Sequence, residues 1–193
     1  KLATPDGYGY VLMHDELPLD DDNVLVTRVT WGPEPQTALE KMNVYTGDRS
    51  PVSAAPLARA RFLTDRAGNA RFASGRDKDG DIVLFYRDPG NQPWRKINDE
   101  GDTGIIESPL GFSDDGKVAY LWAERTTGPD AIIGWDIASG QRTELLRHPK
   151  VDPAFTVEHV DRPGIAGAVY MHDGTSSLWI DPQSPTSRYQ RTL

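Results

Sequence analysis

Several features are scarce or missing in this chain of 193 residues. It contains no cysteine, which excludes disulfide bonds and thiolate chemistry. No apolar run approaches the ~20 residues of a membrane-spanning helix. Basic residues are scattered among a larger number of acids, and the formal net charge is −8, so there is no cationic patch for a phosphate backbone. We therefore expect neither nucleic acid nor a membrane as a partner.

The beginning of the sequence also lacks familiar features. Lys1 stands where an initiator methionine is expected, and no apolar signal segment follows it. We expect that the true start has been removed, which leaves an exported and a cytoplasmic location both open. Gly and Pro are abundant instead, with 18 and 15 copies, and this composition predicts frequent turns and few long helices.

A repeating pattern of strands and turns is clearest over residues 112–146. A turn at 112–117 (FSDDGK) precedes an apolar strand at 118–123, and a polar turn at 126–130 precedes a second strand at 131–137. The turn 138–140 (ASG) then leads to a last strand at 141–146. Asp, Ser and Gly tolerate the left-handed backbone of tight turns, so the unit reads as consecutive β-hairpins.

The unit recurs along the chain. Gly47 and Gly90 are 43 positions apart, Gly90 and Gly140 are 50 apart, and Asp136 and Asp181 are 45 apart. A four-stranded propeller blade repeats every ~40–45 residues. We therefore predict an all-β fold, a β-propeller of about four four-stranded antiparallel blades, formed by one domain over residues 1–193. The predicted blades are 8–54, 59–98, 105–147 and 154–193, and the last strand of the fourth is expected at 188–193.

Residues 112–121 and 135–142 (WDIASGQR) resemble the repeat of TolB-type, WD40-like propellers. Further segments follow in a specific order: 44–47 (VYTG), 62–71 (FLTDRAGNAR), 86–87, 94–95, 108–113 (SPLGFS), 148–152 (HPKVD) and 165–170 (IAGAVY). This series is similar to the N-terminal propeller of bacterial prolyl oligopeptidase-family (S9) serine peptidases, which include dipeptidyl and acylaminoacyl peptidases.

The resemblance implies that the chain is about half of a seven- or eight-bladed propeller. In that family the propeller caps a C-terminal α/β-hydrolase domain, gates the entry of peptide substrates and carries no catalytic residue. A hydrolase domain and peptides are thus the implied partners, and a periplasmic and a cytoplasmic location both agree with it. Half of a ring exposes strand edges, which also predicts self-association through them.

The chain's own candidates for catalysis are weak. Residues 174–178 (GTSSL) approach the G-x-S-x-G elbow of a hydrolase, but Leu178 replaces the second Gly and strands flank the segment. The four histidines, His14, His148, His159 and His172, show no metal-ligand spacing. Acids beside His14 and His172 are expected to point to opposite faces of a strand. We predict no catalytic, cofactor-binding or metal-binding residue and no cofactor.

Other polar and aromatic residues have two interpretations each. The acids at 77–81 and 20–23 suit tight turns better than a calcium loop, because the Gly and Glu spacing of an EF-hand is absent. Arg87 and Arg95 can clamp a peptide carboxylate or pair with neighbouring acids. The tryptophans more often fill spaces between blades than form a recognition surface; they are Trp31, Trp94, Trp122, Trp135 and Trp179.

Three functions remain open at this point. The first is the non-catalytic propeller segment of an S9-type peptidase, and the second is a stand-alone TolB-like propeller that scaffolds protein partners. The third is a small propeller enzyme, such as a lactonase or glycan lyase, with a metal ion in its channel. The first predicts a hydrolase encoded after Leu193, the second a nearby stop codon, and the third bound metal.

Overall fold

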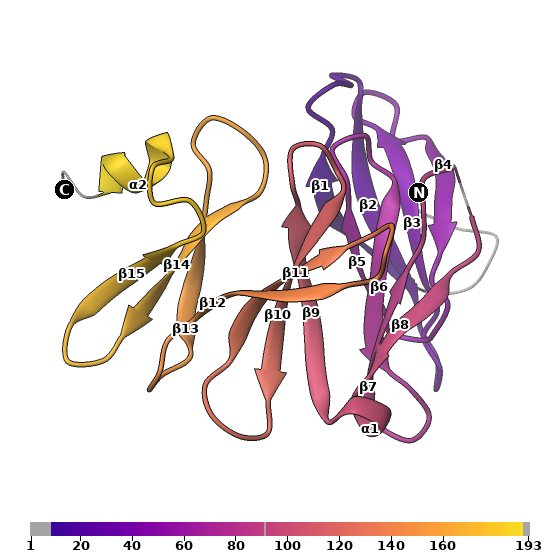
Figure 1. Ribbon diagram of the computed structural model, residues 1–193. Helices are drawn as coiled ribbons and strands as arrows, with labels where there is room; N and C mark the ends of the chain where they lie inside the picture. Colours follow the sequence, from indigo (N-terminus) through magenta and orange to yellow (C-terminus); the bar gives the residue numbers. More distant parts are fainter. Residues whose placement is uncertain (1–8, 91, 191–193) are drawn as a thin grey trace. The chain divides into compact units, whose positions relative to one another are not determined.

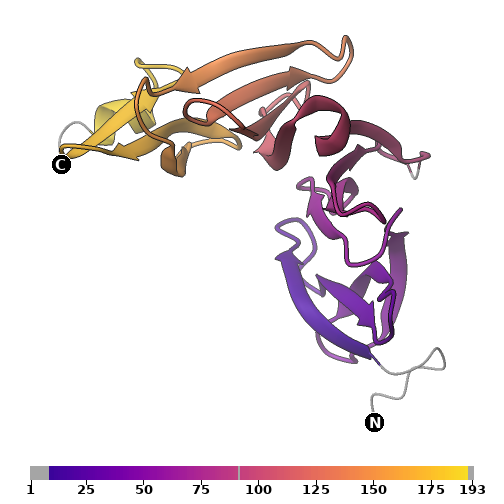
Figure 2. The same cartoon turned by 90° about the horizontal axis from the view of Figure 1, so that it is seen from below.

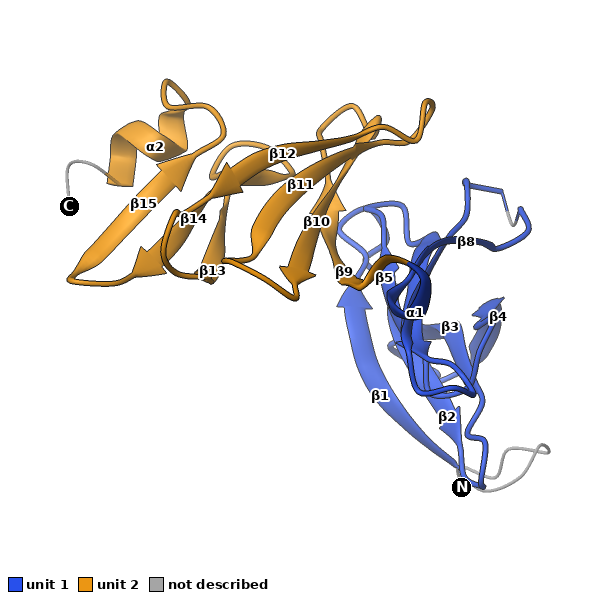
Figure 3. Ribbon diagram, turned by 60° about the horizontal axis from the view of Figure 1, so that its bottom comes forward, with its two compact units in different colours: residues 1–102 blue, residues 103–193 orange. Residues whose placement is uncertain are grey.

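The computed structural model describes residues 9–90 and 92–190 and is built almost entirely of antiparallel β-sheets (Figure 1). The chain forms two compact units, residues 1–102 and 103–193, which are coloured separately in Figure 3. Each unit contains two sheets. The all-β prediction is confirmed, whereas the single domain over 1–193 stays a prediction.

The first sheet has its strands in chain order, so each strand pairs with the next through a hairpin. Its strands are β1 (Gly9–Glu16), β2 (Asn23–Thr30), β3 (Thr37–Asn43) and β4 (Arg49–Ala54). β1 pairs with β2 alone among the described strands, and it forms the indigo edge of the sheet in Figure 2. Its second row of backbone N–H and C=O groups has no neighbouring strand in the described part of the chain.

The second sheet repeats this arrangement in the same unit. Its strands are β5 (Arg61–Thr64), β6 (Ala70–Arg76), β7 (Ile82–Tyr86) and β8 (Arg95–Asp99). A four-residue helix, α1 (Glu100–Thr103), follows β8 and was not predicted.

A hydrophobic cluster joins these two sheets. Leu25 and Leu39 of the first sheet pack with Ala70 of the second, and all three are almost fully buried. Phe62 and Trp94 pack against the cluster from the second sheet, and Trp94 Nε1 donates a hydrogen bond to the Ala54 carbonyl at 3.2 Å. Burial of apolar side chains at about 25 cal/mol per Å² holds such sheets face to face.

The second unit contains the third and fourth sheets, again in chain order. The third sheet comprises β9 (Ile105–Phe112), β10 (Val118–Arg125), β11 (Ala131–Asp136) and β12 (Arg142–Arg147). The fourth comprises β13 (Pro153–Glu158), β14 (Ile165–Met171) and β15 (Thr175–Trp179). A core of Ile132, Leu146, Ala168 and Tyr170 connects them.

The glycines that mark the sequence period occupy equivalent turns. Gly47 and Gly140 each have a φ of 75° and lie between the third and fourth strands of their sheets. A side chain is disfavoured at this left-handed backbone angle, and Gly adopts it freely. The repeat seen in the sequence is therefore a repeat of hairpins.

The predicted last strand of the fourth group is wrong in its described part. Residues 188–190 belong to a helix, α2 (Pro185–Gln190), and 191–193 lie outside the described residues. Ser184 caps this helix, because its Oγ accepts a hydrogen bond from the Ser187 N–H at 3.2 Å. Pro185 at the first helical position is the other local signal that favours a helix start.

Within residues 9–90 and 92–190, neither helix has the length and apolar character needed to traverse a membrane.

Candidate functional site

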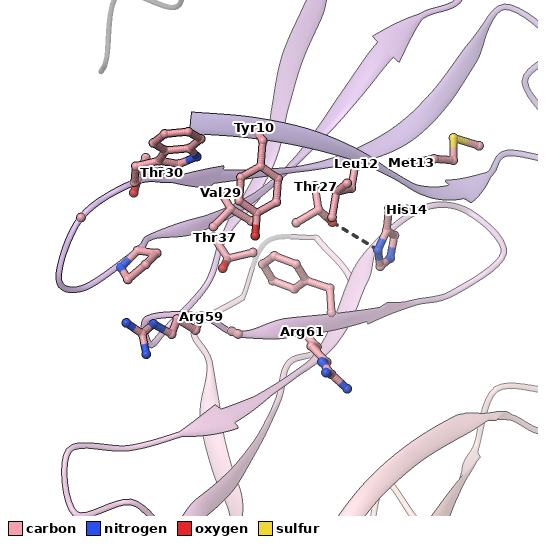
Figure 4. Close-up of a pocket in the computed structure, with 15 residues that line it drawn as sticks. Tyr10, Leu12, Met13, His14, Thr27, Val29, Thr30, Thr37, Arg59 and Arg61 are labelled. Carbon is pink, nitrogen blue, oxygen red and sulfur yellow. Dashed lines mark hydrogen bonds between the residues drawn. The ribbon is translucent and has the colours of Figure 1, made fainter. Parts of the chain in front are cut away.

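A cavity of about 780 Å³ lies in the first unit (Figure 4). We call it the β1 pocket, because four of its fifteen lining residues come from β1. β2 supplies three of the others, and residues 59–62, which lead into and begin β5, supply four. Phe62 contributes both to this lining and to the hydrophobic cluster between the two sheets. The pocket therefore lies next to the hydrophobic cluster, and both are bordered by the first and second sheets.

One wall of the β1 pocket is a face of the first sheet. Tyr10 is directly opposite Val29 in the register of β1 and β2, and Leu12 is opposite Thr27. Because side chains alternate along a strand, these four residues share one face. Tyr10 and Leu12 remain 45% and 55% exposed, so this apolar face is open to solvent.

His14 ends the wall on β1. Its Nδ1 lies 3.3 Å from Thr27 Oγ1. Burial lowers the pKa of His14 below its ordinary value, and the nearby Asp15 carboxylate partly opposes that shift. Asp15 also accepts a hydrogen bond from Thr64 Oγ1 at 3.1 Å, which ties β1 to β5. The imidazole is therefore neutral near pH 7 and adds a polar atom to an apolar wall.

Arg59 is held in an unusual backbone conformation beside the pocket. Its φ is 54°, the one positive value among the described non-glycine residues. Its N–H donates to the Pro35 carbonyl at 2.8 Å, and its Nη2 donates to the Pro33 carbonyl at 3.2 Å. A left-handed non-glycine residue costs roughly 1–2 kcal/mol, so these contacts must outweigh it. They fix the loop that carries Trp31.

The pocket's charge differs from that of the chain as a whole. The lining residues include Arg59 and Arg61 and no Asp or Glu, although the chain has a net charge of −8. Arg61 is exposed, and its guanidinium has no ion pair or hydrogen bond in the described part of the chain. The local charge therefore favours an anion.

Thr37 is a buried polar residue of the lining. Its Oγ1 is shielded from solvent and has no hydrogen-bond partner among the described residues. An unsatisfied buried hydroxyl costs about 1–3 kcal/mol. Apolar walls with a few polar atoms are typical of binding sites.

The lining of the β1 pocket contains no Ser or Cys, and its hydroxyl groups belong to Tyr10 and three threonines. Across residues 9–90 and 92–190, no group of three or more His, Asp or Glu side chains is arranged to hold a metal ion.

The serine segment suggested by the sequence lies elsewhere. Gly174 belongs to the turn between β14 and β15, and Ser176 and Ser177 lie within β15, opposite Tyr170 and Val169. No helix follows directly, so the strand–turn–helix arrangement of a nucleophile elbow is not formed.

The other histidines lie outside the pocket. The His148 ring stacks on Tyr170 with centroids 5.3 Å apart, and burial lowers the pKa of His159. His172 Nε2 lies 3.4 Å from Asp173 Oδ2, so the expectation that these two side chains diverge is wrong. β14 ends at Met171, and strand alternation no longer applies at 172–173.

The acidic segments form turns as predicted. Asp77 Oδ1 accepts hydrogen bonds from the N–H groups of Asp79 and Asp81, at 2.9 and 3.2 Å. Asp20 accepts hydrogen bonds from Asn23 Nδ2 and Lys41 Nζ, at 2.8 and 3.0 Å.

Most tryptophans pack inside the units. Trp135 is 2% exposed, Trp94 and Trp122 contact the two cores, and Trp179 is half-buried. Trp31 differs, because it is 69% exposed and lines the β1 pocket.

Arg87 and Arg95 do not reach this lining. Arg87 Nε donates to the Ala70 carbonyl at 2.8 Å, and its guanidinium lies 4.6 Å from the Trp94 ring centroid. Arg95 lies 3.8 Å from Asp88 Oδ2. Both arginines thus have structural contacts within the second sheet.

Sequence reasoning missed most of the pocket, including Tyr10, Thr37, Arg59 and Arg61. The apolar run 10–13 is typical of a strand, but it does not show which face of that strand is exposed. The arginines gave no signal, because their lack of acidic partners depends on distant segments.

Comparisons with known proteins bear on the fold and the family. No family model matches the chain. Dipeptidyl aminopeptidase BIII of Pseudoxanthomonas mexicana is 26% identical over 118 residues, which cover 61% of this chain and 17% of that protein. The chain therefore spans less than a fifth of this relative. The crystal structure of TolB from Acinetobacter baumannii matches with a TM-score of 0.55 at 17% identity, over 88% of this chain and 40% of TolB.

The sheets are β-propeller blades. Three blades are four-stranded, and three strands of the fourth are described. The β1 pocket thus lies between the first and second blades, both in the first unit.

Proposed function

We propose that this chain is a non-catalytic propeller segment of an S9-type serine peptidase, which caps an α/β-hydrolase active site and gates the access of peptides. The observation that carries the proposal is the 118-residue similarity to a dipeptidyl aminopeptidase. The open, apolar β1 pocket supports a binding role, because it offers a contact area for a peptide. The scattered basic residues and net charge of −8 argue against nucleic acid as a partner.

The first test is the reading frame after Leu193. We expect a G-x-S-x-G segment followed by Asp and then His, the order of an α/β-hydrolase triad. The isolated chain should release no p-nitroaniline from dipeptidyl p-nitroanilides, whereas the full-length protein should release it. A frame that ends shortly after Leu193 would refute the proposal.

Gating itself needs a second measurement on the full-length protein. Substitution of residues in the propeller should change the relative rates for long and short peptides and leave the rate for a small dipeptidyl p-nitroanilide unchanged. Equal effects on both kinds of substrate would contradict a gating role.

A stand-alone scaffold is the second candidate, and the fold of TolB over 88% of the chain favours it. It predicts no hydrolase in the same gene and a propeller that binds a protein partner. The reading frame separates the two candidates.

A further inference from the structure

We propose that the β1 pocket binds the free C-terminus of a peptide, with an apolar last side chain among Tyr10, Leu12 and Phe62 and the carboxylate at Arg59 or Arg61. The inference deepens the proposed function and rests on it only in that the ligand is a peptide. It requires no attached hydrolase, so binding is measurable on this chain.

Charge complementarity is the first step. Glu40 forms ion pairs with two arginines of the first blade. Its Oε1 lies 2.7 Å from Arg28 Nε, and its Oε2 lies 2.8 Å from Arg49 Nη1. Arg59 and Arg61 have no such carboxylate among the described residues, and the pocket lining holds no acid to supply one. Arginine offers five N–H donors in a planar fork that matches a carboxylate. An anion from outside the described chain completes this arrangement.

The apolar walls supply the second step. Tyr10 and Trp31 leave 45% and 69% of their surface exposed beside the pocket. A volume of about 780 Å³ is within the ~300–1,000 Å³ range of ligand sites, so it accommodates more than a single side chain. An apolar terminal residue covers these aromatic surfaces while its carboxylate stays near the guanidiniums.

The backbone supplies the third step and favours a peptide over a simple fatty acid. β1 pairs with β2 alone among the described strands, so its other edge presents N–H and C=O groups. An extended peptide adds to such an edge by main-chain hydrogen bonds. A fatty acid has no N–H group for these main-chain hydrogen bonds.

The arginines stand on the segment opposite β1. Figure 4 shows Arg59 and Arg61 on the side of the pocket across from Tyr10, with their guanidiniums set apart from each other. The carboxylate therefore needs only one of them, and separate substitutions identify which.

The test uses isothermal titration of the 193-residue chain with N-acetyl-Ala-Ala-Ala-Phe. We expect the free acid to bind at least about tenfold more tightly than its C-terminal amide, since charged hydrogen bonds are lost in the amide. The peptide ending in Ala should also bind about tenfold more weakly, because it buries less apolar surface. Octanoate carries the carboxylate and an alkyl chain without a peptide backbone, and it should bind more weakly than the Phe peptide.

Two variants locate the carboxylate, and a third serves as the matched control. Arg59→Gln or Arg61→Gln should abolish the preference for the acid over the amide. Arg66→Gln removes the same charge from an exposed turn of the first unit outside the pocket and should keep the preference. Circular dichroism checks that each variant is folded.

No saturable heat up to about 1 mM peptide, equal binding of acid and amide, or an unchanged preference in both pocket variants would overturn the inference. Octanoate binding as tightly as the Phe peptide would also overturn it, in favour of a fatty-acid site. None of these results bears on the reading frame or on hydrolysis by the full-length protein, so the proposed function is tested separately.

Discussion

At the scale of single residues, ion pairs join positions that are far apart in the sequence. Glu107 on β9 is 4% exposed and receives two hydrogen bonds from Arg142 on β12, at 2.6 and 2.7 Å. The two residues are 35 positions apart and come from opposite edges of the third sheet. No local pattern predicts such a pair, because it depends on the order of the strands.

Glu107→Gln should lower the free energy of unfolding by about 1–3 kcal/mol, since the variant loses the charge that faces Arg142. Arg142 is partly exposed, which limits the loss. Urea unfolding measures the effect. Glu124→Gln on the exposed side of β10 removes the same charge and should change stability by less than about 0.5 kcal/mol. Equal effects of the two substitutions would argue against a stabilising role of the pair.

The buried imidazole of His14 predicts a pH dependence. Burial lowers its pKa below the ordinary 6.5, with Asp15 opposing the shift and no acid in the pocket lining. The unfolded chain therefore binds a proton first, and this contribution to stability is complete above pH 6.5 and declines as the pH falls through that value. It levels off below the pKa of the folded state.

His14→Gln removes this contribution. The stability difference between the parent and the variant, measured by urea unfolding, should shrink as the pH is lowered from 8 to 5, whereas its value at pH 8 reports packing alone. His159 titrates in the same direction in both proteins and cancels from the difference. A difference that is constant with pH would contradict the burial argument.

At the scale of elements, most strands and hairpin turns agree with the sequence predictions, but the sequence did not show which sheet edge is open. β1 carries an exposed apolar row that includes Val11 at 37% and Met13 at 57%. A continuous apolar run such as 10–13 is also typical of a strand inside a sheet. Exposure arises because the described chain places no strand beside it. At the end of the fourth group, the local sequence was the better guide. Ser184 and Pro185 are signals for a helix start, but the strand at 188–193 was predicted from the repeat.

The open edge predicts self-association of the isolated chain through β1. Val11→Lys places a charge on this edge outside the pocket lining and should shift the chain toward the monomer. Size-exclusion chromatography with light scattering over a range of concentrations measures this shift. Thr126→Lys, in an exposed turn of the second unit, adds the same charge and should leave association unchanged. A parent chain that is monomeric at every concentration would refute the prediction.

At the scale of the whole molecule, the sheets divide into two compact units, each with a core between two blades. The hairpin period marked the blades but not this division. Metal binding separates the candidate functions. A propeller enzyme with a metal ion in its channel requires a bound metal, whereas a peptidase propeller segment or a protein-binding scaffold does not.

We expect metal removal to leave the thermal midpoint unchanged. The acids at 77–81 and 20–23 are engaged in turns by their own hydrogen bonds. Calorimetry of the chain after EDTA treatment, and again after addition of calcium, tests this expectation. The calcium concentration should be a hundredfold above the dissociation constant of the site being tested. A bound cation would add about 2.7 kcal/mol at that excess and raise the midpoint by a few degrees. Such a rise would revive the metal-dependent alternative.

The sequence by itself determined the hairpins, because turns that contain Gly47 or Gly140 and alternating strands are set by neighbouring residues. The tertiary structure alone decided which faces remain open and which charges meet. Glu107 and Arg142 pair although their strands are at opposite edges of a sheet. Arg59 and Arg61 line an apolar cavity whose lining contains no acid. These outcomes depend on how strands from distant segments are packed, and burial and charge pairing are properties of that packing.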